Sequence, residues 1–269
     1  MLTATLMSLP LISKTNGDIE EVVVTASLTP ITRSRSGNAV SILNKKQLKN
    51  HASVGITGLL RDVPGFSVSR VGVLGSQTQV RVRGAEANHL VVLFDGVEAN
   101  DPSQGDEFNW ATVTAADIER IEIIRGPQSS LRGSDAIAGV VNIITPSAEK
   151  TSFGFFLESG SRSTHHTGVN LGLKQPDFDV RLGLANIESN GGNIARLGDE
   201  KDGYQNTTLT IKAGAKINEQ VRFSFSARES DGMNQYDADN DYDGLVEDQD
   251  RQSNFYSSNA RLKVDYSSL

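Results

Sequence analysis

Seven acidic side chains and no basic one lie within the fourteen residues 237–250. The whole chain has 33 acidic and 26 basic residues and a formal net charge of −7, so this segment accounts for the entire excess. Carboxylates so close together repel one another unless a cation lies among them. Calcium is a hard cation that prefers such oxygen ligands. The segment therefore predicts a calcium site, with a merely solvated acidic loop as the alternative.

The spacing within this segment also fits a twelve-residue calcium loop. Asp239, Asp241 and Asp243 occupy its first, third and fifth positions, Gly244 its sixth and Asp250 its twelfth. The flanking residues alternate as strands do, so an EF-hand, which needs flanking helices, is not expected. A second acidic pair, Glu200 and Asp202, lies on the preceding long polar connection and is expected on the same side of the sheet.

The sequence offers no residues for disulfides, for a thiolate or histidine metal site, for catalysis or for nucleic-acid binding. The chain contains no cysteine, which excludes disulfides and thiolate sites. His165 and His166 are adjacent, and in a strand they point to opposite faces, which argues against a metal site. No nucleophile elbow, phosphate loop or dinucleotide fingerprint occurs, and no basic stripe suits nucleic acid. We therefore expect neither a catalytic site nor a nucleic-acid partner.

The elements that position the acidic residues have a period of two. Six successive segments between residues 153 and 266 alternate apolar and small or polar side chains, at lengths near the roughly 9–11 residues of a membrane-spanning strand. Short connections near 174–177 and 218–219 alternate with long polar ones near 189–203 and 231–253. This pattern favours an outer-membrane β-barrel, and a soluble meander or sandwich is the alternative. No apolar run is long enough for a transmembrane helix.

The first 150 residues have a different, mixed pattern. Apolar residues 1–12 resemble part of an export signal, and a β-prone island follows at 21–26. Short helices near 45–48 and 56–60, and strands that end in glycine turns at Gly84 and Gly96, predict a compact α+β domain.

Six short sequence motifs in this region, in this order, resemble those of the plug domain of TonB-dependent outer-membrane receptors. They are EVVVTA at 21–26, LLRDVPG at 59–65, VRVRG at 80–84, LFDGV at 93–97, IERIEIIRGP at 118–127 and GSDAIAGVVNIIT at 133–145. The resemblance implies an α+β plug domain followed by antiparallel transmembrane β-barrel strands, an incomplete barrel of about six strands. It divides the chain into a leader (1–18), a TonB box (19–28), a plug (29–148) and the N-terminal part of a barrel (149–269).

The resemblance also implies partners and a location in the outer membrane of a Gram-negative bacterium. The TonB energy-coupling protein would pair with the segment Glu21, Val22, Val23, Val24 and Thr25. Six strands cannot close around a plug of this size, and open edges are untenable in lipid, so the chain is expected to be a fragment. The charged plug residues Arg81, Arg83, Glu119, Glu122, Arg125 and Arg132 are expected to form salt bridges to the barrel wall, with an ordinary surface charge as the alternative for each.

Within the family, the residues at 191–193, 200–203, 231 and 236–238 are similar to the calcium-bearing outside loops of cobalamin receptors. Additional acids after Ala238 depart from that pattern, and siderophore receptors share the plug motifs. The expected calcium ligands are Glu200, Asp202, Asp231, Asp237, Asp239, Asp241, Asp243 and Asp250. The expected contacts to cobalamin or a siderophore are Val71, Gly72, Leu74, Gly75, Ser76, Gln77, Asn100, Asp101 and Ser103.

Three functions remain open at this point. The first is an energy-coupled outer-membrane receptor for cobalamin or a ferric siderophore. The second is a secreted, calcium-stabilised β-protein for adhesion, which would have no use for the β-prone island at 21–26. The third, an enzyme with an unfamiliar motif, is the least favoured.

Overall fold

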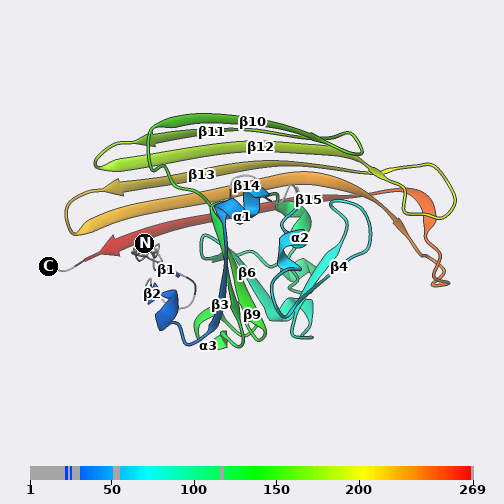
Figure 1. Ribbon diagram of the computed structural model, residues 1–269, viewed down its shortest axis with the longest axis horizontal. Helices are drawn as coiled ribbons and strands as arrows, with labels where there is room; N and C mark the ends of the chain where they lie inside the picture. The colour runs from blue at the N-terminus through cyan, green and yellow to red at the C-terminus, as the bar shows by residue number, and fades with distance from the viewer. Residues whose placement is uncertain (1–21, 24, 26–30, 51–54, 116–117, 268–269) are drawn as a thin grey trace, which may run out of the picture.

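The computed structural model describes residues 22–23, 25, 31–50, 55–115 and 118–267. They form two parts, an N-terminal α+β domain and a long six-stranded sheet that arches over one side of it (Figure 1). We refer to this sheet as the wall. The predicted fold class, an α+β domain followed by antiparallel strands, is therefore confirmed.

The N-terminal domain is built on a five-stranded mixed sheet in the order β3-β8-β9-β6-β7. Its strands are β3 (Ala39–Asn44), β8 (Arg120–Arg125), β9 (Gly139–Ile144), β6 (Leu90–Phe94) and β7 (Val97–Glu98). Every residue of β6 and β9 is buried, and these two strands pair in parallel. Near-continuous apolar runs are typical of parallel strands that are covered on both faces.

Smaller elements cover this sheet. A hairpin joins β4 (Phe66–Arg70) to β5 (Thr78–Val82), and a two-pair ladder joins β1 (Val22–Val23) to β2 (Ile31–Thr32). The helices are α1 (Lys45–Asn50), α2 (Thr57–Leu60), α3 (Ser129–Arg132) and the 3-10 turns η1 (Arg33–Arg35), η2 (Ala87–His89), η3 (Pro102–Gln104) and η4 (Trp110–Thr112). The main core joins side chains of α2, β5 and η4, such as Leu60, Val80 and Trp110, to side chains of the sheet, such as Ile143.

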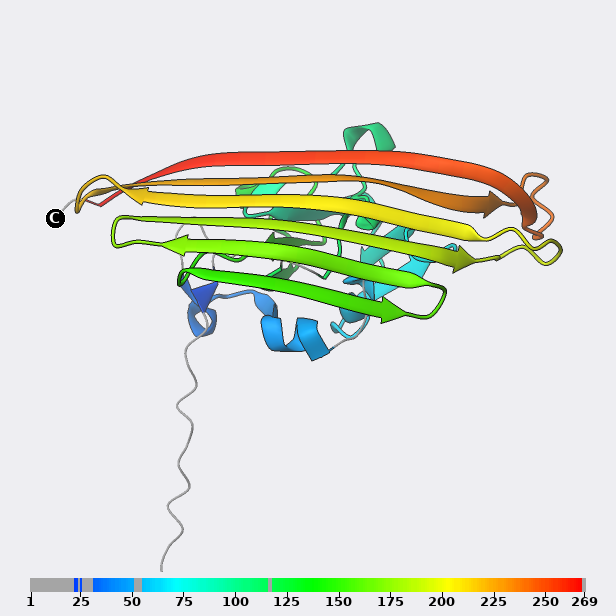
Figure 2. The ribbon, with the colours of Figure 1, turned by 90° about the horizontal axis from the view of Figure 1, so that it is seen from above.

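The wall consists of six antiparallel strands that pair in chain order (Figure 2). They are β10 (Ser152–Gly160), β11 (Thr164–Lys174), β12 (Phe178–Gly192), β13 (Asp202–Lys216), β14 (Val221–Ala238) and β15 (Glu247–Tyr266). The sheet is not closed, since among the described residues β10 and β15 each pair with one neighbour. The six predicted period-two segments are thus six strands of a partial barrel.

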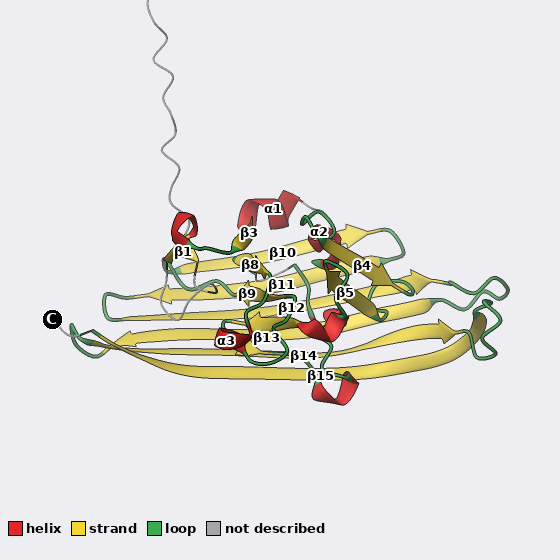
Figure 3. Cartoon of the chain, turned by 90° about the horizontal axis from the view of Figure 1, so that it is seen from below, coloured by secondary structure: helices red, strands yellow, loops and turns green. Residues whose placement is uncertain are grey.

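The two faces of the wall differ as the alternation predicts. The face turned away from the N-terminal domain carries a belt of exposed apolar side chains: Phe153, Phe155, Leu157, Val169, Leu171, Leu173, Phe178, Leu182, Leu184, Leu209, Phe223, Phe225, Leu262 and Val264. Phe155 is 75% exposed, which a soluble domain would rarely tolerate in such a band. Figure 3 shows the N-terminal domain lying against the opposite face.

The described residues include no helix long and apolar enough to cross a membrane.

The two ends of the wall also differ. Residues 175–177 and 217–220 make short turns at one end, and 193–201 and 239–246 make longer connections at the other. We call the latter the long-loop end. The ladder β1–β2 lies toward the short-turn end, and α2 and β4 lie toward the long-loop end (Figure 1). The acidic segment is shorter as a loop than expected, because β14 runs to Ala238 and β15 starts at Glu247.

Close packing of β9 against β8 depends on Gly139. A Cβ atom at this position would lie 2.4 Å from the carbonyl oxygen of Ile124, which is backbone and cannot move aside. We expect Gly139→Ala to destabilise the N-terminal domain by about 1–3 kcal/mol, the usual cost of overpacking. Hydrogen–deuterium exchange of β8 and β9 in the intact protein measures this.

Gly37→Ala is the matched control, because a Cβ atom there meets nothing within 4 Å. Equal exchange in the two variants would contradict the assignment of strain to Gly139.

Candidate functional site

The N-terminal segment is anchored on a buried carboxylate. The backbone N–H and the hydroxyl of Thr25 both donate to Oε2 of Glu122, at 3.0 Å and 2.6 Å. Asn142 Nδ2 donates to the Thr25 hydroxyl at 3.0 Å, and Arg132 Nη2 donates to the Thr25 carbonyl at 3.1 Å. Thr25 is 1% exposed and Glu122 is fully buried. Hydrogen bonds to a charged group are the stronger kind, so this is a firm attachment.

The buried carboxylate is itself stabilised by its neighbours. Arg120 approaches the second oxygen, Oε1, with Nε and Nη2, each at 2.9 Å. Glu122 and Asn142 face each other in the β8–β9 register, which brings both side chains under Thr25. A buried charge is tolerated only when it is paired and hydrogen-bonded in this way.

Of the five residues predicted to bind TonB, the structure describes Val22, Val23 and Thr25; Glu21 and Val24 lie outside the described residues. Val22 and Val23 pair with Thr32 and Ile31, so this strand already has a partner within the domain. The Val23 side chain is buried against Val40 and Ile124.

Hydrogen bonds continue from this anchor to the wall. Asn142 Oδ1 accepts from the N–H of Gly96 at 3.1 Å, in the turn that also contains Asp95. The Asp95 carboxylate accepts from the Thr145 hydroxyl at 2.5 Å and from Lys212 Nζ, on β13, at 2.8 Å. The path from Thr25 to the wall therefore passes through Asn142 and the turn at Gly96.

A second set of contacts joins the wall to η4. The Tyr204 hydroxyl donates to the carbonyl of Ala111 at 2.6 Å, and Asn206 Nδ2 donates to the same oxygen at 3.1 Å. Arg228 and Ser230 donate to the carbonyl of Thr112. Sequence reasoning missed these contacts because their acceptors are backbone atoms, which leave no signal in side-chain types.

The expectation that plug charges would bridge to the wall is wrong for most of those named. Glu119 pairs with Lys45 at 2.6 Å, Glu122 with Arg120, and Arg81 with Glu86 at 3.7 Å, all within the N-terminal domain. Arg125 donates to the Pro64 carbonyl and the Ser41 hydroxyl, and Arg132 to Thr25. Each of these residues has a partner within the N-terminal domain that lies close to it, so none of these contacts reaches the wall.

An acidic cluster lies at the long-loop end. Carboxylate oxygens of Glu200, Asp237 and Asp248 lie within 4.8 Å of one another. Asp202, at the first position of β13, is 0% exposed; the backbone N–H of Ile194 approaches its carboxylate, and no side chain among the described residues donates to it. Glu200 Oε2 and Asp237 Oδ2 are buried without a hydrogen-bond partner in the described structure. Carboxylate oxygens that lie at one place without side-chain donors fit a hard cation with oxygen ligands.

Electrostatics at the cluster are consistent with this fit. Burial, followed by the neighbouring carboxylates Asp202 and Asp237, raises the pKa of Glu200 above its ordinary value. Burial and then Asp237 likewise raise the pKa of Asp202. Both residues lie beyond the apolar belt. Crowded anions favour protonation or cation binding over the free charged state.

The other predicted metal ligands do not join this cluster as a group. Asp239 accepts from the N–H groups of Asp243 and Gly244, and Asp243 accepts from Leu245, so these carboxylates hold their own turn. The remaining ones are exposed: Asp231 within β14, Asp241 in the turn and Asp250 within β15. Asp248, which sequence reasoning did not select as a ligand, takes their place.

Asp248 was not selected because the expected ligands followed the spacing of a twelve-residue calcium loop, and Asp248 is not at one of the positions used. The ladder shifts register between Tyr236 and Ala238, which brings Asp248 beside the connection 193–201. There Asp248 accepts from Asn193 Nδ2 at 3.0 Å and from the N–H of Asp199 at 3.1 Å.

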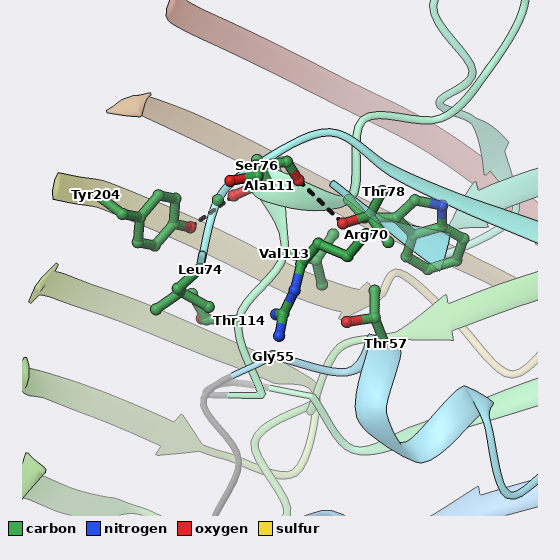
Figure 4. Close-up of a pocket in the computed structure, with 12 residues that line it drawn as sticks. Gly55, Thr57, Arg70, Leu74, Ser76, Thr78, Ala111, Val113, Thr114 and Tyr204 are labelled. Carbon is green, nitrogen blue, oxygen red and sulfur yellow. Dashed lines mark hydrogen bonds between the residues drawn. The ribbon is translucent and has the colours of Figure 1, made fainter. Parts of the chain in front are cut away.

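The loop predicted to contact a ligand, after β4, packs against the wall. Leu74, Gly75 and Ser76 line a small cavity of about 20 Å³ together with Trp110 and Tyr204 (Figure 4). This is room for about one water molecule. Gly72 and Gly75 are half-buried, and Val71 and Gln77 point to the outside.

The second predicted ligand loop holds itself together. Asn100 accepts from Val92 N–H at 2.8 Å and donates to the carbonyls of Leu90 and Asp106. Asp101 Oδ1 accepts from both the N–H and the hydroxyl of Ser103. These three side chains shape the loop, which leaves backbone and neighbouring atoms for any ligand.

Comparison with known proteins places this geometry in a family. The family model described as the TonB-dependent Receptor Plug Domain matches residues 32–140. A curated relative, the Vitamin B12 transporter BtuB of Vibrio vulnificus (strain CMCP6), is 31% identical over 230 residues, which are 81% of this chain and 36% of the relative. The chain thus spans about a third of the length of this relative.

Solved structures share the fold. The Pseudomonas aeruginosa receptor FpvA, bound to heterologous pyoverdines, has a TM-score of 0.74 at 13% identity, over 91% of this chain and 34% of that one. The ferric yersiniabactin uptake receptor FyuA from Yersinia pestis has a TM-score of 0.65 at 19% identity, over 86% and 38%. At these identities the likeness establishes the fold alone.

The anchor at Thr25 is testable by removing one hydroxyl. We expect Thr25→Val to loosen residues 22–25 by about 1.5–3 kcal/mol, the usual contribution of hydrogen bonds to a charged group. Amide exchange of the peptide that contains these residues should become about tenfold faster or more. Thr32→Val is the control, since the exposed Thr32 hydroxyl makes a long contact of 3.4 Å with Ser34 Oγ and none with Glu122 in the described structure. Unchanged exchange in Thr25→Val would refute the anchor.

Proposed function

The chain belongs to the family of TonB-dependent outer-membrane receptors, and from this premise we propose that it serves energy-coupled uptake of a scarce nutrient, cobalamin, across the outer membrane of a Gram-negative bacterium. The observation that supports uptake most is the anchor at Thr25, from which hydrogen bonds lead through Asn142 and Asp95 to Lys212 of the wall. A pull on the N-terminal segment would therefore reach the plug–wall contact. Cobalamin is favoured because the relative at 31% identity is a vitamin B12 transporter.

The energy-coupling partner in this proposal is TonB, which would pair with residues 21–25 as an added strand. Main-chain pairing of this kind needs an extended segment with free donors and acceptors. Val22 and Val23 hold only two ladder pairs with β2. So short a ladder is readily exchanged for pairing with another chain.

Cargo would enter from the long-loop end. The loops that follow β4 and β7 face that half of the molecule, and the expected contacts Val71, Gly72 and Gln77 remain accessible in part. The acidic cluster lies close by, since a Cβ atom on Gly72 would come within 3.4 Å of Ile194 in the 193–201 connection. Ordering of that connection would therefore shape the rim of the entrance.

Calcium would bind at the acidic cluster, with Glu200, Asp202, Asp237 and Asp248 as the first ligands. The buried, unpartnered oxygens support this choice. The cation would neutralise the repulsion and tie the 193–201 connection to the β14–β15 hairpin. Any gain in cargo affinity on calcium binding must be matched by an equal gain in calcium affinity on cargo binding.

The uptake function predicts a split between binding and transport. Val23→Pro removes the ladder N–H and fixes φ, so pairing with TonB should be lost. In cells that express the intact receptor, uptake of labelled cyanocobalamin should fall to background while surface binding stays unchanged. Val23→Ala, which keeps the backbone N–H and therefore the main-chain pairing, is the matched control. Normal uptake by Val23→Pro would contradict coupling at this segment.

Titration of candidate nutrients into the purified protein identifies which one it binds. Purified intact protein should bind cyanocobalamin saturably and should not bind a ferric catecholate siderophore at equal concentration. Binding of the siderophore alone would replace cobalamin as the cargo and leave the receptor function in place.

Calcium binding should depend on pH and on the cluster. Because the pKa values of Glu200 and Asp202 are raised, protons compete with the metal, and calcium affinity should rise as pH increases from the ordinary carboxylate range upward. Without calcium the sign reverses: the protonated cluster stabilises the loops at low pH, and this contribution is lost as pH rises through the raised pKa values.

Calorimetric titration of calcium measures both effects. Asp237→Asn should weaken calcium binding about tenfold or more, as expected when one charged ligand is lost, and Glu219→Gln, exposed at the short-turn end, should not. Asp241→Asn shows whether the turn supplies a further ligand. Equal calcium affinity in Asp237→Asn and the unaltered protein would remove the cluster as the site.

A further inference from the structure

A second polar cavity lies between the plug and the wall near the long-loop end. Its volume is about 320 Å³, far larger than the one beside Tyr204. Three arginines line it: Arg61 at the end of α2, Arg70 at the end of β4, and Arg162 in the turn between β10 and β11. Two of them belong to the plug and one to the wall, so the cavity exists only because the two parts meet.

No acidic side chain lines this cavity. Its other side chains include the hydroxyls of Thr57, Thr164 and Ser189, which are neutral. Among the described residues, none of the ion pairs involves any of the three arginines, and the one hydrogen bond found from their guanidinium groups is a long one of 3.4 Å from Arg61 to the Val68 carbonyl. In a chain with seven more acids than bases, an acid-free group of three arginines is conspicuous.

The three positive charges influence one another. Burial first, and then repulsion from Arg61 and Arg162, lower the pKa of Arg70 from its ordinary value. The three guanidinium groups repel one another across the cavity. An anion placed among them would be attracted by all three and would offset that repulsion.

All three arginines are solvent-exposed, and for two of them the surroundings define where the side chain lies. Figure 4 shows the Arg70 side chain extending between the loops toward Gly55 and Thr57. Arg162 has a φ of 58° in its tight turn, and its carbonyl accepts from Asn190 N–H at 3.0 Å. Its guanidinium lies over Gly192, where a Cβ atom would come within 3.4 Å of Cζ. A binding group that is already positioned loses less entropy when a ligand arrives.

We propose that this cavity is an anion subsite that binds a phosphate or carboxylate group carried by the transported ligand. Guanidinium groups match such oxyanions with paired, charge-assisted hydrogen bonds. Thr57 adds a neutral hydroxyl donor from the plug side, and the absence of a lining carboxylate removes competition for the arginines. The inference rests on the proposed receptor function, because it takes the ligand to enter from the long-loop end.

Inorganic phosphate is the probe that tests the cavity without knowledge of the cargo. Calorimetric titration of sodium phosphate into the intact protein, at constant ionic strength, should show saturable binding. Arg70→Gln and Arg162→Gln should each weaken it about tenfold, since each removes charge-assisted hydrogen bonds. Arg35→Gln, an exposed arginine in η1 away from the cavity, is the matched control. No saturable binding, or equal weakening by all three variants, overturns the subsite.

Cyanocobalamin, which carries a phosphodiester, tests the link to the cargo. We expect phosphate to compete with it and Arg70→Gln to lower its affinity about tenfold, as removal of a charge-assisted contact predicts. Unchanged cyanocobalamin affinity in both cavity variants overturns the inference and leaves the receptor function standing. Phosphate binding that follows the arginines, in a protein that does not bind cyanocobalamin, upholds the cavity and refutes cobalamin as the cargo. Arg70→Lys, which keeps the charge, should retain part of the phosphate affinity and exclude misfolding as the cause of the loss.

Discussion

The inner face of the wall is polar, and its donors must find acceptors once the plug excludes water from them. This constraint organises the contact between the two parts. Tyr204, Asn206, Arg228 and Ser230 all donate to two consecutive backbone carbonyls of η4, and Lys212 donates to Asp95 and Thr145. Because a buried unpaired donor costs about 1–3 kcal/mol, the plug must present these acceptors in register with the strands. The five-stranded sheet of the plug fixes them there.

The same constraint gives the two ends of the molecule different chemistry. At the short-turn end, the buried charge of Glu122 is fully satisfied by Arg120 and Thr25, so the structure there is closed. At the long-loop end, the described residues include buried carboxylate oxygens without a hydrogen bond, on Glu200 and Asp237, and exposed guanidinium groups that form no ion pair, on Arg70 and Arg162. An unpaired charge in a closed core costs free energy of folding. The same charge is suited to a site where a bound ion or ligand pairs with it.

Sequence patterns predicted the elements better than the contacts between them. Alternation fixed all six wall strands, and short motifs such as LFDGV and VVNIIT located the plug strands, because both signals are local. Asp95 and Lys212 are 117 residues apart and lie in unremarkable surroundings, so nothing local pairs them. The calcium-loop spacing does not include Asp248, which reaches the cluster where the β14–β15 ladder shifts register, and Arg70 and Arg162 meet only after the plug has docked.

The two-pair ladder of β1 and β2 has a mechanical consequence. A load applied to the chain ahead of Val22 meets only the pairs Val22–Thr32 and Val23–Ile31 before it reaches Thr25. Such a ladder opens like a zipper, one pair at a time, at small tension, whereas β8 and β9 would have to be sheared along six paired residues at once. Under such a load the β1–β2 ladder would separate first. The hydrogen bonds of Thr25 would bear the load next, and the sheet of the plug would transmit it to the wall.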